Sequence, residues 1–115
     1  MYKELILELY KHPKNFGHLE EATHTKRMYN PLCGDDITIE MIIKKGRVET
    51  IMFHGESCAI CRASASLLTD YTKGKQLAKL VQLDADFMKD LVGIDISPGR
   101  IKCLLLPLEV LKHIS

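Results

Sequence analysis

The sequence lacks an excess of charge of either sign, since 16 lysine and arginine residues are balanced by 15 aspartate and glutamate residues. Such a balance provides no bulk attraction to nucleic acid or to an anionic membrane. The chain also lacks an apolar run long enough to cross a bilayer, and acidic residues interrupt the N-terminal segment, where a signal peptide would be continuously apolar. We therefore expect a cytoplasmic protein that binds neither nucleic acid nor membrane and recognises partners through local patches.

Internal repeats and low-complexity segments are missing as well. A chain of 115 residues is in the size range of one domain and can bury a modest core without disulfides. We therefore expect a single domain over residues 1–115. Two disulfides among the four cysteines would require an oxidising compartment, which nothing in the sequence indicates.

The four cysteines lie in three separate segments. Cys33 stands in NPLCGDD, Cys58 and Cys61 stand in GESCAICRASAS, and Cys103 stands in RIKCLLLP. Zinc and iron–sulfur clusters both prefer deprotonated sulfur, and Asp35 adds a carboxylate two residues after Cys33. The pattern therefore predicts a metal or sulfur protein.

Other interpretations of the cysteines are weaker. A structural zinc clip usually has two CxxC pairs, whereas only Cys58 and Cys61 have that spacing. The same pair would suit a redox CxxC at a helix N-terminus, where the helix dipole lowers a thiol pKa. We interpret Cys61 first as a small buried packing residue, ahead of a reserve ligand or persulfide acceptor.

Hydrophobic periodicity predicts the first half of the structure. Apolar residues from Tyr2 to Leu9 recur at helical spacing, and the helix must end before Pro13. Residues 14–30 show no sustained period and are interpreted as a mobile or partly extended segment. Alternating apolar residues over 37–43 and 48–54, separated by Lys44, Lys45 and Gly46, predict an antiparallel hairpin with a solvated tip.

The second half of the sequence predicts helices. One helix follows Cys58, contains the small residues of 63–66, and ends at Gly74; another is expected from about Gln76 to Leu91. A breaker cluster at 97–99 precedes the last helix, with Pro107 compatible with its first turn. This order predicts a small α+β domain, an antiparallel sheet with helices packed on one face.

These elements place the candidate ligands at segment ends. Cys33 precedes the first predicted strand, Cys58 follows the second, and Cys103 is near the entrance to the last helix. Three such positions can converge at one end of the sheet. We expect each cysteine to be partly exposed, with helix N-termini favouring the thiolates.

The same segments carry a family resemblance. NPLCGDD, the GESC…ASASLLTDYTKGK block and RIKC resemble, in order and context, the iron–sulfur cluster scaffold family that includes IscU, SufU and the N-terminal part of NifU. The opening YKELILELYKHPKNFG is similar to that family's first helix and the turn after it. The resemblance runs from Tyr2 to about Leu111 and implies the same α+β fold.

The resemblance implies a ligand set and a function. In the scaffold family, the residues matching Cys33, Asp35, Cys58 and Cys103 bind the metal or cluster, and the oxygen ligand is associated with a loosely held cluster. A protein of this kind accepts sulfur from a cysteine desulfurase, with Cys33 and Cys103 as candidate persulfide acceptors. It then assembles a transient [2Fe–2S] cluster for apo iron–sulfur acceptor proteins, and we expect a monomer or weak dimer.

Departures from the family pattern leave an alternative open. Many scaffolds carry histidine before the last cysteine, but this chain has Lys102, which cannot ligate a metal when protonated and would instead lower the pKa of Cys103. Lysine here resembles the SufU branch, which binds zinc and relays sulfur as a sulfurtransferase. The stretch 76–99 looks too short for that branch's insertion. The chaperone-binding segment is only weakly matched by 98–102, so a chaperone partner stays open.

Two further expectations complete the sequence interpretation. The histidines are scattered without ligand spacing, and His24 is the one that a mobile segment could swing to the site. Outside the family, the competing function is a CxxC dithiol oxidoreductase using Cys58 and Cys61. We expect a scaffold rather than a metabolic enzyme.

Overall fold

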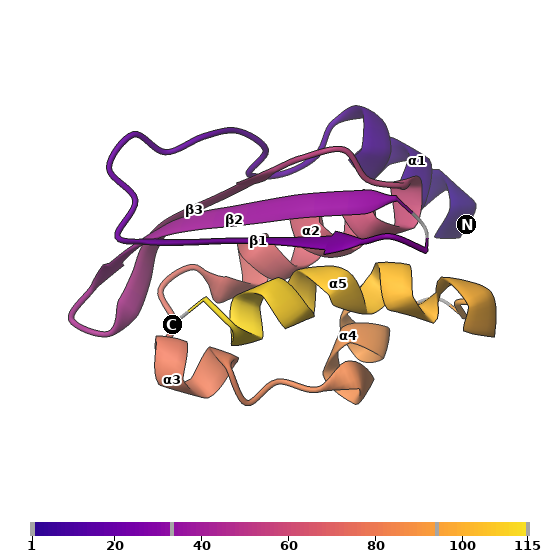
Figure 1. Ribbon diagram of the computed structural model, residues 1–115. Helices are drawn as coiled ribbons and strands as arrows, with labels where there is room; N and C mark the ends of the chain where they lie inside the picture. The colour runs from indigo at the N-terminus through magenta and orange to yellow at the C-terminus, as the bar shows by residue number, and fades with distance from the viewer. Residues whose placement is uncertain (1, 33, 94, 115) are drawn as a thin grey trace.

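An antiparallel sheet of three strands carries the helices on one side (Figure 1). The computed structural model describes residues 2–32, 34–93 and 95–114. In that part of the chain the elements are α1 (Tyr2–Lys11), β1 (His24–Asn30), β2 (Asp35–Lys44), β3 (Arg47–His54), α2 (Ala59–Thr72), α3 (Leu77–Leu80), α4 (Ala85–Val92), the 3-10 turn η1 (Pro98–Arg100) and α5 (Ile101–Lys112). The predicted α+β class is confirmed.

Strands β2 and β3 form the predicted hairpin. In its antiparallel register Ile39 pairs with Phe53 and Met41 with Ile51, and all four side chains are buried on the helix-facing side. The turn residues Lys45 and Gly46 both have positive φ, 53° and 77°, which suits a tight turn between twisted strands. The hairpin therefore supplies one wall of the core.

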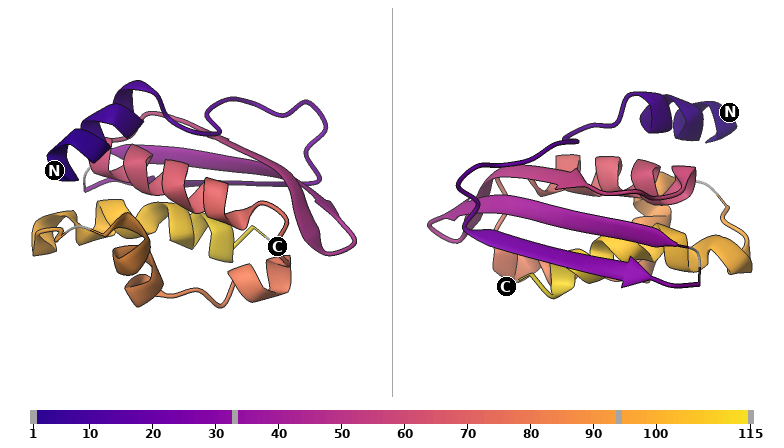
Figure 2. Two further views of the ribbon diagram at one scale, coloured as in Figure 1. Left: turned by 180° about the vertical axis from the view of Figure 1, so that it is seen from behind. Right: turned by 45° about the horizontal axis from the view of Figure 1, so that its top comes forward.

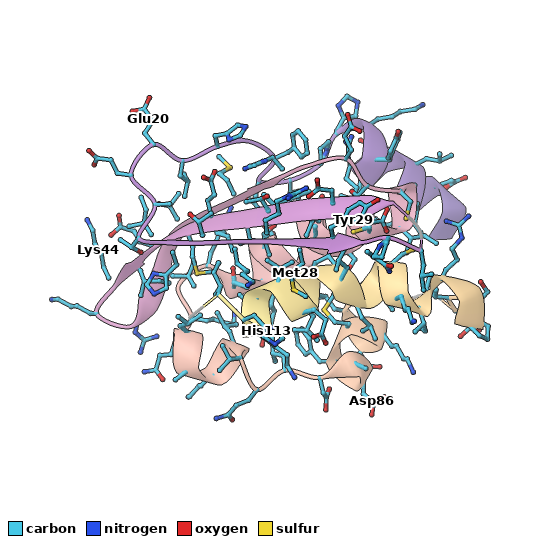
Figure 3. The ribbon with its side chains drawn as sticks, in the orientation of Figure 1. Glu20, Met28, Tyr29, Lys44, Asp86 and His113 are labelled. Carbon is cyan, nitrogen blue, oxygen red and sulfur yellow. The ribbon has the colours of Figure 1, made fainter. Side chains whose placement is uncertain are left out.

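Strand β1 occupies part of the segment 14–30, which the sequence predicted to be mobile or partly extended, and residues 24–30 follow the extended alternative. β1 pairs antiparallel with β2 at the edge of the sheet and alternates between half-buried and exposed positions. Met28 packs on the core while the neighbouring Tyr29 is exposed, on opposite sides of the strand (Figure 3). Polar residues dominate β1 because only one of its faces meets the core.

An ion pair joins the outer faces of β1 and β2. Arg27 donates two hydrogen bonds to the Asp36 carboxylate, at 2.8 Å and 2.6 Å. The hydrogen bond from Arg27 lowers the pKa of Asp36 below its ordinary value. Asp36 therefore stays ionised on the face of β2 opposite to the one that Asp35 occupies.

Helices α2 and α5 cover the inner face of the sheet side by side (Figure 1). The small residues predicted to allow close packing, Ala63 to Ser66, are all buried. The Ser64 hydroxyl donates a 2.6 Å hydrogen bond to the Leu104 carbonyl of α5, a distance that only close helix approach permits. This contact fixes α5 relative to α2.

Helix α1 ends before Pro13, as predicted, and packs against α2 (Figure 2). The segment after it runs along the free side of β3, where the Phe53 N–H donates to Asn15 and the Gly17 N–H donates to Phe53. Since β1 lies on the opposite edge, residues 18–23 must cross the outer face of the sheet (Figure 2). The Leu19 N–H anchors this crossing by donating to Glu40 on β2.

The single helix predicted over 76–91 is wrong, because the chain forms two short helices there, α3 and α4. Asp84 separates them: its side chain accepts a hydrogen bond from the Phe87 N–H at 2.9 Å and caps the N-terminus of α4. An aspartate cap requires an extended backbone at its own position, which ends any continuous helix.

Helix α5 begins earlier than predicted, because η1 leads directly into Ile101 and Pro107 lies inside the helix rather than in its first turn. Pro107 is buried between Leu106 and Leu108, so tertiary packing offsets the helix hydrogen bond that proline cannot donate. No helix within the described residues has the length and apolar character needed to cross a lipid bilayer.

Gly55 determines how the chain leaves β3 toward α2. Its φ is +129°, and a Cβ built there would lie 2.1 Å from the Asp36 carbonyl oxygen. The next residue, Glu56, accepts a hydrogen bond from the Asp36 N–H at 2.9 Å. Only glycine allows the link to pass this close to the start of β2.

We predict that Gly55→Ala will destabilise the fold by more than about 2 kcal/mol, through left-handed strain and steric overlap. Thermal unfolding followed by circular dichroism should show a midpoint lower by more than about 10 °C. Gly99→Ala is the matched control, because a Cβ at Gly99 meets no atom of the described residues within 4 Å. Equal midpoints for the two variants would contradict this account.

Candidate metal centre

Cys58 is held at the N-terminus of α2 by the link that Gly55 allows. It is the N-cap residue, with φ −69° and ψ 168°, and its Sγ accepts a hydrogen bond from the Cys61 N–H at 3.4 Å. Unpaired backbone N–H groups and the positive end of the helix dipole both favour an anionic group at this position. The Cys58 side chain therefore lies at the positive end of α2, where a bound metal's sulfur ligand would be placed.

Asp35 opens β2 and lies against Cys58. Its Oδ1 accepts the Cys58 N–H at 2.8 Å, and its Oδ2 lies 3.6 Å from the Cys58 Sγ, which donates as a thiol. The Asp35 side chain is buried, 1% exposed, on the face of β2 that the helices cover. A buried carboxylate next to a cysteine can bind a cation that replaces the thiol proton.

Cys103, in the first turn of α5, completes the group. The α2–α5 contact at Ser64 brings the start of α5 to the N-terminal end of α2. One ligand atom each from Asp35, Cys58 and Cys103 lies within 4.8 Å of the others. The structure therefore brings together three of the four predicted ligands; the fourth, Cys33, lies outside the described residues.

The donor set fits the groups that the sequence predicted. Two sulfurs and one carboxylate oxygen match zinc, whose sulfur ligands lie at about 2.3 Å, and also match an iron–sulfur cluster. Among the described residues, Cys58, Cys61 and Cys103 are not joined to one another by disulfides.

The predicted partial exposure of the cysteines is confirmed for Cys58 and wrong for Cys103, which is 1% exposed. Cys103 is buried because α5 starts before it and turns it toward the core. It nevertheless lines a cavity of about 290 Å³, together with Lys102 and Leu32. A cavity therefore borders Cys103 even though the residue itself is almost fully buried.

Cys61 is a packing residue, as predicted. It is fully buried in the core between the helices and the sheet. Burial, together with the nearby negative charges of Asp35 and Cys58, raises the pKa of the Cys61 thiol far above its ordinary value. An unreactive neutral thiol does not suit a redox CxxC pair, which disfavours the oxidoreductase alternative.

The histidine prediction needs two corrections. His24 is fixed in β1, paired with Met41, and does not swing to the cysteine site. Sequence spacing also missed that His18, Glu40 and His54 lie together, with one ligand atom each within 4.8 Å of the others. They come from three segments, and no periodicity in the sequence could have associated them.

Comparison with known proteins identifies the family. The family model described as the NifU-like N-terminal domain matches residues 1–114. The chain belongs to the NifU-like N-terminal domain family. The relatives in the following comparison are named as a zinc-dependent sulfurtransferase, SufU, and as an iron–sulfur cluster assembly scaffold protein, IscU.

Relatives of both kinds resemble this family member along most of its length. The zinc-dependent sulfurtransferase SufU of Bacillus subtilis is 32% identical, with 97% of this chain and 87% of SufU covered. The scaffold protein IscU 1 of Archaeoglobus fulgidus is 29% identical, with 98% and 73% covered. The alignment with SufU spans 129 positions, so SufU carries residues that this 115-residue chain lacks.

Solved structures share the fold of this NifU-like chain. A crystal structure described as a cluster assembly scaffold of the SUF system, from Fervidobacterium islandicum, gives a TM-score of 0.84 at 25% identity, covering 96% of this chain and 93% of the other. The N-terminal part of a NifU-like protein from Brucella abortus gives 0.79 at 20% identity, covering 98% and 90%. The second comparison bears on the fold alone.

We predict that Cys58→Ser will weaken zinc binding by more than about tenfold, because it removes a sulfur ligand. Mutating a residue that only supports a ligand already lowers metal affinity by about tenfold or more. Cys61→Ser should bind zinc with wild-type stoichiometry, since Cys61 is buried beside the site as a packing residue. Competition with a chromophoric chelator measures both affinities. Equal losses in the two variants would show that Cys61 is a ligand.

The raised pKa of Cys61 also predicts a pH dependence. The thiol stays protonated in the folded protein but ionises above about pH 8.5 when unfolded. Its contribution to stability is therefore complete below that pH and falls as pH rises, by up to about 1.4 kcal/mol per pH unit. Urea unfolding across alkaline pH should show a steeper decline for wild type than for Cys61→Ser. Parallel curves would exclude the raised pKa.

Proposed function

We propose that this protein accepts sulfur from a cysteine desulfurase and assembles a labile [2Fe–2S] cluster, which it passes to apo iron–sulfur proteins. The observation that carries the proposal is the meeting of Asp35, Cys58 and Cys103 donor atoms within 4.8 Å of one another. Membership of the NifU-like family supports it, because relatives such as IscU 1 of Archaeoglobus fulgidus are cluster assembly scaffold proteins. Cys33 is the fourth proposed ligand.

In this proposal the iron and sulfide are cargo, and the ligands are chosen for release. Cys33, Cys58 and Cys103 provide soft thiolates that match iron. Asp35 provides a hard oxygen, which binds iron in this shell less firmly than sulfur does and also accepts the Cys58 N–H. A carboxylate that releases the metal while Oδ1 keeps its backbone hydrogen bond can open a coordination position for an acceptor thiolate.

Sulfur acceptance requires a nucleophilic thiolate that a partner can reach. The thiolate of Cys33 or Cys103 would attack the terminal sulfur of the desulfurase persulfide. The sulfur–sulfur bond in the desulfurase breaks, its electron pair leaves on the desulfurase cysteine as a thiolate, and a persulfide forms on this chain. The cavity beside Cys103 supports this role, and Lys102 on its wall would stabilise the anionic sulfur.

A second function, a zinc-bound sulfur relay, is favoured by two specific observations. The chain is 32% identical to a zinc-dependent sulfurtransferase, and it has Lys102 where an imidazole ligand would otherwise stand. In that function Cys33, Asp35, Cys58 and Cys103 would hold zinc, which fixes the thiols and keeps them ionised. Sulfur would then pass from the desulfurase to an acceptor through one of these cysteines.

Both functions imply the same cellular location and the same partners. Thiolate ligands and persulfides persist where thiols are kept reduced, so the proposal includes a cytoplasmic location. We propose that the chain acts as one domain and as a monomer or weak dimer, with the cysteine desulfurase and apo acceptor proteins as partners.

Asp35→Ala tests the scaffold function. We expect the reconstituted [2Fe–2S] cluster of this variant to last several-fold longer than that of wild type in the presence of an apo acceptor, because the labile oxygen ligand is gone. Visible absorbance followed over time under anaerobic conditions measures the lifetime. A cluster that decays faster than in wild type would refute the role of Asp35 in release.

Asp36→Asn is the matched control, because the adjacent carboxylate lies on the outer face, paired with Arg27. Its cluster should decay at the wild-type rate. If the protein is a zinc relay, Asp35→Ala should instead lower zinc affinity and sulfur transfer from the desulfurase, and neither wild type nor variant should form a stable cluster. The two functions therefore give different outcomes with the same pair of variants.

A further inference from the structure

His18, Glu40 and His54 form a second cluster of metal-ligating side chains, on the outer face of the sheet. Glu40 alternates with the buried Ile39 and Met41, so its side chain lies on the side of β2 away from the helices. Asp35 is five residues earlier in the same strand, roughly 17 Å away along its length, and faces the other side. The two clusters are therefore separate.

Glu40 is the centre of this cluster. Its Oε1 lies 3.7 Å from His18 Nδ1 and 3.5 Å from His54 Nε2. Metal–nitrogen and metal–oxygen bonds of about 2.1 Å place neighbouring ligands of a tetrahedral ion about 3.4 Å apart. The two distances to Glu40 are close to that separation without an ion present.

A backbone hydrogen bond helps to hold the cluster in place. The Leu19 N–H donates to Glu40 Oε1 at 3.1 Å and so fixes the segment that carries His18 over β2. The side chains of Glu40 and His54 are 15% and 23% exposed, whereas that of His18 is 73% exposed. Two ligands are therefore partly desolvated and preorganised, and the third is on the solvent side.

The imidazole rings indicate what binding would require. The rings of His18 and His54 stack with centroids 3.9 Å apart and planes inclined by 29°. An ion needs both lone pairs directed at it, so the rings must splay apart. The His18 side chain is 73% exposed, so its ring can move away from His54 into solvent.

We propose that His18, Glu40 and His54 bind a divalent first-row transition metal ion, independently of the cysteine site. Two imidazoles and one carboxylate with open positions suit iron(II) or zinc, with water completing the shell. Without a thiolate ligand, the ion should bind more weakly and exchange faster than one held by the cysteines. Binding would also tie the crossing segment 18–23 to β2 and β3.

Cobalt(II) titration of the full chain, anaerobic and with thiols reduced, tests this site. Cobalt bound to cysteine shows sulfur-to-metal charge-transfer absorbance, and cobalt bound to nitrogen and oxygen does not. We expect wild type to bind one equivalent of cobalt(II) beyond the equivalent at the cysteine site, as measured by equilibrium dialysis. This additional equivalent should add no charge-transfer absorbance. Failure of the cysteine site would remove the charge-transfer signal instead, so the two results are distinguishable.

Three variants assign the additional equivalent to its ligands. Glu40→Gln keeps an oxygen for the Leu19 N–H while removing the charge, and His54→Gln and His18→Gln each remove one imidazole. Each should weaken the additional equivalent by more than about tenfold and leave the charge-transfer band unchanged. His18→Gln keeps the test decisive if the others disturb folding, because its ring is largely exposed.

His113→Gln is the matched control, because His113 lies at the far end of α5 and is exposed (Figure 3). It should bind both equivalents like wild type. If wild type binds no additional equivalent of cobalt(II), the proposal is overturned. The cluster would then only hold the crossing segment against β2 through its contacts with Glu40. Wild-type binding in Glu40→Gln and His18→Gln, or an equal loss in His113→Gln, would overturn it as well.

Discussion

The close contact between α2 and α5 is the constraint on which the structure depends. Four small residues in succession, 63–66, let the two helix backbones approach until Ser64 reaches the Leu104 carbonyl. A larger side chain there would separate the helices, and Cys103 would move away from Cys58. The same contact that closes the core therefore sets the spacing between the sulfur atoms of these two proposed ligands.

The third ligand depends on the sheet rather than on the helices. Gly55 lets the chain pass over the start of β2, and the Cys58 N–H then meets Asp35. Asp35 thus serves the fold when no metal is bound, by satisfying a backbone donor at a helix N-terminus. Under the proposed function its second oxygen would bind the metal, so the same side chain would contribute to both stability and cargo binding.

Local patterns in the sequence predicted those parts of the fold that have strong periodicity. The hairpin and α2 follow from apolar alternation and from small residues with a terminal glycine. The sequence did not identify β1 as a strand, because its apolar and polar residues alternate too weakly. It is an edge strand with one face on the core, and it is rich in polar residues such as Arg27. The start of α5 was misplaced because Pro107 inside a helix is tolerated only through tertiary packing, which the sequence does not display.

The candidate site was predictable to the same degree. Placing Asp35, Cys58 and Cys103 at segment ends was enough to predict that they meet, whereas Cys33 stays a prediction. The burial of Cys103 was not predictable, because it depends on where α5 begins. The sequence did not predict the cluster of His18, Glu40 and His54. These residues come together only because residues 18–23 cross the sheet, and such a tertiary contact leaves no local pattern in the sequence.

The edge position of β1 has a consequence for the behaviour of the protein at high concentration. An exposed strand edge offers unpaired backbone groups to any other extended chain, which is how cross-β assemblies start. β1 carries Lys26 and Arg27, and the Arg27–Asp36 pair sits on the face beside that edge. A second chain docking there would have to desolvate these charges, so the charged residues of β1 disfavour aggregation through this edge.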